Sequence, residues 1–265
     1  MFSREVTTVH GRRVSYLRGG HGPNLLLLHG WPVTGSSFSL VMQELVDRFD
    51  VIAPDLPGFG ESQTLEGRHN DSTMAGTVFG LLAALGIQRT TVGGVSMGAR
   101  IALKMASIDQ LQETVDRLVL NAPPIRHIEQ MTPSQIHRFR TAQDNPVIRY
   151  GLYLTMKAFP GLFCQLVFGS ALDLHNPIYT PIIRDVKKSS LRAPWQMLTE
   201  FTLTNARGYL PYVHQPTIVF VGEQDVQFKN PSREVARRVQ HGRFIELPGD
   251  HWMAVQDPRQ FAMQF

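Results

Sequence analysis

Short apolar runs alternate along the chain with segments whose apolar residues recur every three or four positions. Each run is bounded by Gly, Pro or polar residues, a pattern typical of strands that are buried on both faces of a parallel sheet. The runs that predict strands lie at residues 25–28, 51–53, 90–95, 118–120, 217–221 and 244–247. Residues 6–9 and 14–17 predict two further short strands, which Gly11 joins as a hairpin.

The segments between these runs carry a helical pattern. Val78, Leu81 and Leu85 lie on one apolar stripe, and Gly86 follows them as a C-terminal stop. Helices are predicted at residues 38–46, 74–85, 97–108 and 231–239. Strands that alternate with helices predict an α/β fold, in which a mostly parallel central sheet is flanked by helices on both faces.

Residues 123–212 break this alternation, because they contain no convincing strand. The segment is rich in aromatic residues and Met, namely Tyr150, Tyr153, Met156, Phe159, Phe163, Phe168, Tyr179, Trp195, Met197 and Phe201. We therefore expect a helical cap inserted into a core domain that consists of residues 1–122 and 213–265. The apolar side chains of the insertion allow two interpretations: they line a pocket for a hydrophobic substrate, or they pack the insertion against the core.

The composition indicates a globular protein with ample material for an apolar core, since 43% of the 265 residues are hydrophobic. The formal net charge is +4, and the basic residues are scattered in short clusters such as Arg12-Arg13. A protein that binds nucleic acid normally gathers such charge into a stripe or a recognisable module. We therefore expect no nucleic-acid partner.

Expectations about localisation and cofactors follow from features that the sequence lacks. Cys164 is the only cysteine, which excludes an intramolecular disulfide or a cysteine metal cluster. The first residues do not form a secretion signal, and the apolar run at residues 25–28 is far too short to span a bilayer. No pair among the ten histidines has metal-ligand spacing with supporting carboxylates. We expect a soluble cytoplasmic protein without a transmembrane segment, a metal or a cofactor.

The pentapeptide Gly94-Val95-Ser96-Met97-Gly98 carries the clearest catalytic signal. It directly follows a predicted strand and opens a predicted helix, which is the setting of a nucleophile at a tight strand-to-helix turn. Such a turn strains the backbone, and side chains at the flanking positions would clash, so Gly is needed there. We expect the turn to expose the Ser96 hydroxyl and to aim the backbone amide of Met97 at a developing oxyanion.

A second motif, His29-Gly30-Trp31-Pro32, follows the predicted strand at residues 25–28. Together with the serine motif it resembles the α/β-hydrolase family, whose members carry an HG-aromatic-P turn at the end of an early strand. The resemblance implies that the backbone N–H of Trp31 is the second oxyanion donor, whereas Pro32 has no N–H to donate. It also implies that His29 braces the turn and does not act as a base.

The segment Asp55-Leu56-Pro57-Gly58-Phe59-Gly60-Glu61-Ser62 resembles the D-x-P-G-x-G-x-S loop of the same family. Its glycines and proline predict a tight turn near the active site, with a structural role only. The resemblance covers the core, roughly residues 4–123 and 211–265. The insertion corresponds to the helical lid that many members of the family carry.

A hydroxyl nucleophile needs a base, and the base needs an orienting acid. The chain order in this family is nucleophile, acid, histidine, which the resemblance places on Ser96, Asp225 and His251. Asp225 ends the segment Gly222-Glu223-Gln224-Asp225, which is similar to the G-x-x-D loop of the family. Asp225 and His251 both follow predicted strands, so they fall at the carboxyl ends of strands, where open α/β sheets place ligands.

Other residues are weaker candidates for the acid that orients His251. The competing carboxylates are Glu223, Asp250 and Asp257. Glu223 precedes the matching position, and Asp250 is too close in sequence to face His251 comfortably. Some relatives carry the acid after the sixth strand, where this chain has Asn121. An amide does not stabilise an imidazolium as a carboxylate does. Asp225 is therefore the expected acid.

These residues predict a serine hydrolase that cleaves an ester or thioester of a small-to-medium hydrophobic substrate through an acyl-enzyme. Ser96 stands where epoxide hydrolases and haloalkane dehalogenases have Asp, which argues against those two activities. Two alternatives stay open. The first is a hydrolase of a carbon–carbon or lactone bond with the same triad, and the second is a non-catalytic hydrolase-fold protein that binds a ligand. Fold alone does not decide among them.

Overall fold

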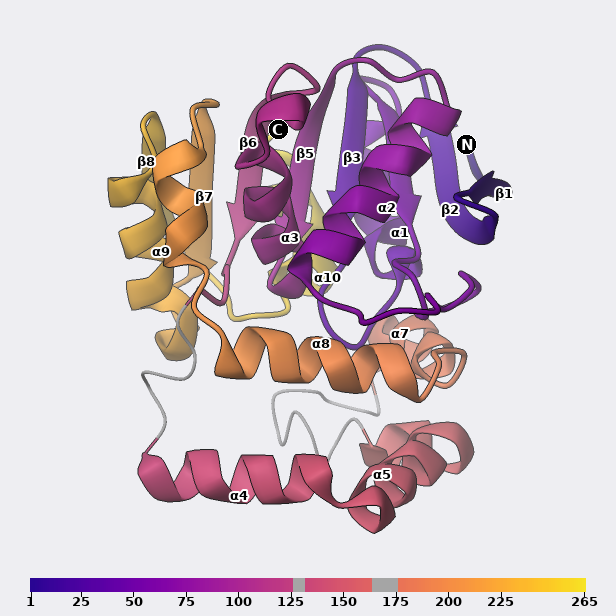
Figure 1. Cartoon of the computed structure of the whole chain (residues 1–265). Coiled ribbons are helices and arrows are strands. Elements are labelled where there is room, and N and C mark those ends of the chain that lie inside the picture. The colour runs from indigo at the N-terminus through magenta and orange to yellow at the C-terminus, as the bar shows by residue number, and fades with distance from the viewer. Residues whose placement is uncertain (126–131, 164–175) are drawn as a thin grey trace.

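The structure is a computed structural model that describes residues 1–125, 132–163 and 176–265. Cys164 and Phe168 therefore lie outside the described residues. Within them, an eight-stranded sheet with the order β1-β2-β4-β3-β5-β6-β7-β8 forms the centre of the protein (Figure 1). The strands are β1 (Phe2–Val9), β2 (Arg12–Gly20), β3 (Asn24–Leu28), β4 (Asp50–Pro54), β5 (Thr90–Val95), β6 (Val115–Asn121), β7 (Thr217–Gly222) and β8 (Gly242–Leu247).

The sheet is antiparallel at one edge and parallel elsewhere. β1 and β2 form a hairpin, and β2 pairs antiparallel with β4. His10 and Gly11 turn this hairpin with positive φ values of 49° and 74°. The other neighbouring strands pair in parallel. Each strand predicted from the apolar runs lies within an observed strand, so the predicted α/β fold with a mostly parallel sheet is confirmed.

Helices cover both faces of the sheet. One face carries α2 (Asp71–Ala84), α3 (Met97–Ala106) and α9 (Val226–Arg238), and the other carries α1 (Ser39–Leu45), α10 (Met253–Gln256) and α11 (Pro258–Ala262). Buried residues of each helical layer belong to a separate apolar cluster, and the sheet contributes side chains to both clusters. The central strands of the sheet are therefore buried on both faces.

Helix α2 begins one turn before the apolar pattern predicts. Its first residue is Asp71, whereas the apolar stripe starts at residue 74. Asn70 caps the helix, because Asn70 Oδ1 accepts a hydrogen bond from Thr73 N at 2.9 Å and Thr73 Oγ1 accepts one from Asn70 N at 3.0 Å. This reciprocal capping box stabilises a polar first turn that leaves no trace in the apolar periodicity.

The predicted start of helix α9 was wrong by five residues. The pattern predicts a helix over residues 231–239, with Pro231 at its start. The helix instead begins at Val226 and contains Pro231 in its interior. Asp225 is its N-cap and accepts a hydrogen bond from Phe228 N at 3.4 Å. Asp225, the predicted acid of the triad, is thus also the residue that caps the start of α9.

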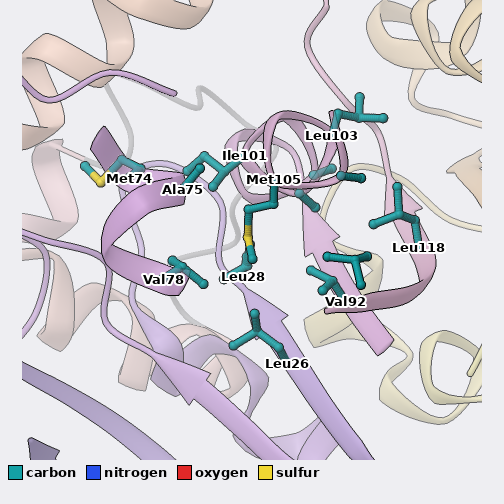
Figure 2. Packing of buried hydrophobic residues seen from close by; sticks show 14 of the residues in the cluster. Leu26, Leu28, Met74, Ala75, Val78, Val92, Ile101, Leu103, Met105 and Leu118 are labelled. Carbon is teal, nitrogen blue, oxygen red and sulfur yellow. The ribbon is translucent and has the colours of Figure 1, made fainter. Parts of the chain in front are cut away.

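The apolar run of β3 is buried on both sides of the sheet. Leu25, Leu26, Leu27 and Leu28 are fully buried. Leu26 and Leu28 pack with residues of α2 and α3, and Figure 2 shows them within that cluster. Leu25 and Leu27 belong to the cluster on the opposite face, with residues of α1 and α11. This two-sided burial explains why the run is continuous and does not alternate with polar residues.

Helices also occupy the described part of the segment between β6 and β7. They are α4 (Pro133–Asp144), α5 (Pro146–Ala158), α7 (Thr180–Val186) and α8 (Arg192–Leu203). Figure 1 shows α7 and α8 directly below the sheet and α4 and α5 farther out. No strand occurs among the described residues of 123–212, as the pattern predicts. None of the described helices is long and apolar enough to cross a membrane.

A buried ion pair ties this insertion to the sheet and its helices. Arg100 Nε on α3 donates to Asp71 Oδ2 on α2 at 2.8 Å, and each side chain is 1% exposed. Arg100 Nη1 also donates to Pro124 O at 3.0 Å and to Thr204 O at 3.3 Å. The Tyr209 hydroxyl donates to Asp71 Oδ2 at 2.9 Å. One guanidinium thus holds the chain where it leaves β6 and again where it leaves α8.

Replacing Asp71 with Ala is expected to lower the free energy of unfolding by about 3–5 kcal/mol, because the buried Arg100 guanidinium loses its counter-charge. Asp116→Ala is the matched control, since Asp116 pairs with Arg89, whose side chain is 75% exposed. An exposed pair of this kind contributes about 0–1 kcal/mol. Urea unfolding measures both values, and equal losses in the two variants would contradict the role assigned to the buried pair.

Candidate active site

Ser96 stands at a sharp turn between β5 and α3. Its backbone adopts φ 51° and ψ −115°, a conformation that residues other than Gly rarely take. Two hydrogen bonds hold the turn: Ser96 N donates to Asn121 O at 2.8 Å, and Arg100 N donates to Ser96 O at 3.1 Å. The serine motif therefore has the strand, turn and helix that its sequence predicts.

The two glycines of the motif are required because their surroundings leave no space for a side chain. A Cβ on Gly94 would lie 2.6 Å from Ala99 N, and a Cβ on Gly98 would lie 2.0 Å from Leu28 O. Both distances are far inside van der Waals contact, so the predicted clash at these positions is confirmed. Without the two Cβ atoms, α3 packs directly against the ends of β3 and β5.

His251 and Asp225 meet in a hydrogen bond although they are 26 residues apart in the chain. His251 Nδ1 lies 2.7 Å from Asp225 Oδ2, and the Asp225 side chain is 5% exposed. The Phe228 ring stacks on the imidazole with 4.7 Å between the ring centroids. Because Nδ1 is bonded to the carboxylate, Nε2 is the ring nitrogen left to accept a proton.

The other polar residues considered as partners of His251 make different contacts. Asp250 Oδ1 accepts a hydrogen bond from Trp252 N at 2.7 Å. The side-chain amide of Asn121 donates to a carbonyl oxygen of β7 at 3.3 Å. Among the described residues, no three His, Cys, Asp or Glu side chains are grouped as a metal site requires. Asp225 is thus the predicted acid whose carboxylate is observed in a hydrogen bond with the imidazole of His251.

Ser96 and His251 line the same small pocket, whose volume is about 30 Å³. The remaining lining is largely apolar and consists of Gly30, Trp31, Val33, Ser37, Phe38, Val95, Trp252, Ala254 and Val255. In the part of the chain that the structure describes, no direct hydrogen bond joins the side chains of Ser96 and His251. The structure nonetheless brings the loops after β3, β5, β7 and β8 to one place, at the carboxyl ends of these strands.

Met97 and Trp31, the predicted oxyanion donors, lie next to Ser96. Met97 is the first residue of α3, so its amide is one of the N–H groups that a helix leaves without an intrahelical partner. Trp31 lines the pocket, and a Cβ on the preceding Gly30 would lie 3.6 Å from Ser96 Cβ. The positive end of the α3 dipole also favours negative charge beside Ser96. The donor role of the two amides stays a prediction.

His29 is fully buried and braces the turn that follows β3. Its Nε2 accepts a hydrogen bond from Leu56 N at 3.0 Å, so its Nδ1–H donates to Gly30 O at 2.8 Å. Burial lowers the pKa of His29 to about 4, because a charged imidazolium would lose its hydration there. Both ring nitrogens are used in the scaffold, which agrees with the predicted bracing role.

Asp55 organises the loop that follows β4. Its Oδ1 accepts a hydrogen bond from Gly35 N at 2.9 Å, and its Oδ2 accepts one from Glu61 N at 3.0 Å. Arg4 Nη1 lies 2.7 Å from Asp55 Oδ2 and balances the charge of this buried carboxylate. Gly60 has φ 52°, and a Cβ there would lie 2.4 Å from Asp55 Oδ2. These contacts agree with the structural role predicted for the loop.

Arg100 and Phe228 support the site although neither belongs to a recognisable motif. Arg100 holds the carbonyl of Ser96 through its backbone and the insertion through its guanidinium. The signal that could have indicated Arg100 is a charged residue among the apolar residues of the predicted helix at residues 97–108. Phe228 stacks on His251 from the first turn of α9, and nothing local distinguishes it from any other aromatic residue.

Comparison with known proteins shows a family match over most of the chain. A protein-family model described as alpha/beta hydrolase fold matches residues 23–258. The chain is also 38% identical over 250 residues to the magnesium-chelatase 30 kDa subunit of Rhodobacter capsulatus. That alignment covers 87% of this chain and 81% of the Rhodobacter protein.

Other similarities are either shorter or confined to the fold. An uncharacterized protein of Mycobacterium bovis is 38% identical over 113 residues, which cover 43% of this chain and 33% of that protein. This chain thus spans only a third of the length of that relative. The solved structure of a thermophilic esterase from Thermogutta terrifontis has a TM-score of 0.78 at 23% sequence identity, with 98% of this chain and 96% of that chain covered.

Replacing Gly98 with Ala is expected to destabilise the protein, because the new methyl group would lie 2.0 Å from Leu28 O. Overpacking of this kind costs about 1–3 kcal/mol. Gly76→Ala in α2 is the control, because a Cβ there meets nothing within 4 Å. That control is expected to stabilise the helix by up to about 1 kcal/mol. Thermal unfolding distinguishes the two, and a Gly98→Ala protein as stable as the wild type would refute the close packing.

Stability is expected to fall as the pH drops from about 6.5 to about 4, in part through His29. Its pKa is about 4 in the folded protein and about 6.5 in an unfolded chain. The unfolded chain therefore binds the proton first, and up to about 3 kcal/mol of stability present above pH 6.5 is lost over this range. The free energy of unfolding of the wild type is expected to fall more steeply than that of His29→Gln. Parallel curves for the two proteins would contradict the assignment.

Proposed function

The chain belongs to the alpha/beta hydrolase fold family, and from this premise we propose that it is a serine hydrolase. Ser96 is the nucleophile, His251 is the general base, and Asp225 is the acid that orients His251. The observation that carries the proposal is the 2.7 Å hydrogen bond between His251 and Asp225, formed beside a serine on a strained strand-to-helix turn. Ser96 and His251 also line one pocket, as nucleophile and base must.

The proposed reaction begins when Ser96 Oγ attacks the carbonyl carbon of an ester or thioester and its proton passes to His251 Nε2. Asp225 stabilises the imidazolium that forms. The carbonyl oxygen becomes an oxyanion, to which the backbone amides of Met97 and Trp31 donate. When the carbonyl re-forms, the bond to the leaving group breaks. The leaving group takes the proton from His251 and departs, and an acyl group remains on Ser96.

A water molecule completes the proposed cycle. His251 removes a proton from the water while the water oxygen attacks the acyl carbon. The backbone amides of Met97 and Trp31 donate to the oxyanion that forms in this second step. Ser96 Oγ then leaves and recovers a proton from His251, which releases a carboxylic acid. Each proton that the imidazole accepts is thus returned within the same half-reaction.

In this proposal residues 123–212 form a cap over a core that consists of residues 1–122 and 213–265. The insertion contacts the pocket directly, because Trp31 Nε1 donates to Pro194 O of α8 at 2.7 Å. The two parts share a buried apolar cluster that contains Val33, Met156, Phe163, Tyr179, Val186, Trp252 and Val255. A largely apolar pocket under such a cap favours a small-to-medium hydrophobic substrate.

Two other functions fit the same residues. The triad would also serve the hydrolysis of a lactone or a carbon–carbon bond, which differs in the substrate and not in the site. A non-catalytic role is favoured by the Rhodobacter relative, which is named a magnesium-chelatase subunit and is covered over 81% of its length. A chain of that kind would act as a component of a chelatase assembly, with little or no turnover of its own. Turnover that depends on Ser96 distinguishes a hydrolase of any of these bonds from a non-catalytic protein.

Ser96→Ala is expected to abolish covalent labelling by a fluorophosphonate and to lower kcat for p-nitrophenyl esters on the order of 10⁶-fold, because the nucleophile is lost. Ser107→Ala is the control: it removes a hydroxyl that donates to Lys104 O at the far end of α3. Labelling that persists in Ser96→Ala would refute the assigned nucleophile. A wild-type protein that is neither labelled nor active would favour the role in a chelatase assembly.

A further inference from the structure

Trp31 lines two neighbouring cavities. The inner cavity is the pocket that contains Ser96 and His251. The outer cavity lies among residues of the insertion, and its lining adds Arg149, Leu152, Tyr153, Met156, Phe163, Leu191, Pro194, Trp195 and Leu198 to Trp31. Trp31 is the one described residue that belongs to both linings. Its side chain is therefore the wall between the two cavities.

The inner cavity is the smaller of the two. Its volume is about 30 Å³, whereas the outer cavity measures about 70 Å³. The inner cavity is thus less than half the size of the outer one. The outer cavity is the larger space, and it adjoins the pocket of Ser96 on the other side of Trp31.

The contacts that anchor the Trp31 indole come from the insertion. Its Nε1–H donates to Pro194 O at 2.7 Å. Its ring centroid lies 6.3 Å from that of Phe163 and 6.3 Å from that of Phe201. Rotation of the indole would break the hydrogen bond to Pro194 O. The position of Trp31 thus depends on α8 and on the aromatic residues around it.

The outer cavity contains a hydrogen-bond donor in largely apolar surroundings. Trp195 lines the cavity, and its indole Nε1 is buried without a hydrogen-bond partner among the described residues. Buried polar groups in folded proteins are nearly always hydrogen-bonded. Trp31 Nε1, in contrast, is satisfied by Pro194 O. A ligand oxygen in the outer cavity would supply the acceptor that Trp195 lacks.

We propose that the outer cavity binds the long apolar arm of the substrate and that Trp31 determines specificity by separating this cavity from Ser96. The arm is an apolar acyl group that carries an oxygen acceptor, to which Trp195 Nε1–H donates. This inference rests on the proposed function, because it places the scissile ester beside Ser96. It adds a substrate class and two specificity-determining residues to that function.

Filling the outer cavity tests the first part of the proposal. Leu152→Trp places an indole in the cavity wall. Leu154→Trp is the matched control, because Leu154 lies on the same helix, is 47% exposed and lines neither cavity. The readout is the ratio of kcat/KM for p-nitrophenyl octanoate to that for p-nitrophenyl acetate. Each buried CH₂ contributes roughly fourfold, so Leu152→Trp is expected to lower the ratio at least about tenfold. Leu154→Trp is expected to leave the ratio within about twofold of the wild type.

Removing the wall tests the role of Trp31. Trp31→Ala retains the backbone N–H but lacks the indole, so the ratio of octanoate to acetate is expected to rise. Trp31→Phe loses the hydrogen bond to Pro194 O and keeps a ring, and it is expected to raise the ratio by less. Thermal unfolding establishes that each variant is folded. A ratio that is unchanged or lower in both variants would overturn the assignment of Trp31 as the wall.

Trp195→Phe tests the oxygen acceptor. The substrates are p-nitrophenyl octanoate and the p-nitrophenyl esters of keto-octanoic acids with the ketone at successive positions. For the keto isomer whose oxygen reaches Trp195, kcat/KM is expected to fall about three- to tenfold relative to octanoate, because one hydrogen bond is lost. If no keto isomer distinguishes Trp195→Phe from the wild type, the proposed acceptor is refuted.

Fluorophosphonate labelling separates a failure of this inference from a failure of the proposed function. If Ser96 is labelled and p-nitrophenyl acetate is hydrolysed, but the chain-length ratio does not respond to Leu152→Trp, the inference about the outer cavity is wrong and the triad stands. If Ser96 is not labelled and no ester is hydrolysed, the proposed function fails and the inference fails with it.

Discussion

The close packing of helix α3 onto the ends of β3 and β5 is the constraint on which the candidate site depends. A Cβ on Gly98 would lie 2.0 Å from Leu28 O, and a Cβ on Gly94 would lie 2.6 Å from Ala99 N. In so little space, the chain that leaves β5 has to reverse direction sharply to enter the helix. Ser96 is the residue at this reversal, which accounts for its φ of 51°. The position of the hydroxyl is thus a consequence of how the helix packs on the sheet.

The same helix connects the turn to the insertion. Arg100 N donates to Ser96 O, and the Arg100 guanidinium pairs with Asp71 and bonds to Pro124 O and Thr204 O. A fully buried guanidinium is tolerated only when its charge is paired and its donors are used, as they are here. The turn at Ser96 and the insertion, at Pro124 and at Thr204, therefore share one anchor. Trp31 adds a second link, since its indole joins the pocket wall to α8.

The strands and the serine turn were predictable because each depends on residues that are close in the chain. Leu25 to Leu28 had to be apolar in succession to be buried on both faces, and the serine turn had to be flanked by Gly. Helix starts were less predictable, because side chains that cap a helix, such as Asp225, lie outside its apolar stripe. The resemblance to a family indicated Asp225 as the acid, but the contact with His251 appears only in the folded chain.

The sequence by itself determined the class of the fold, the places of the strands and the local shape of the turn at Ser96. The tertiary structure decided which distant residues meet. Asp71 and Arg100 are 29 residues apart, and Trp31 and Pro194 are 163 residues apart. The physical reason is that strand and helix patterns repeat every two or 3.6 residues and can be read locally. A hydrogen bond between two segments has no such period, because the order of the strands and the placement of the insertion bring its partners together.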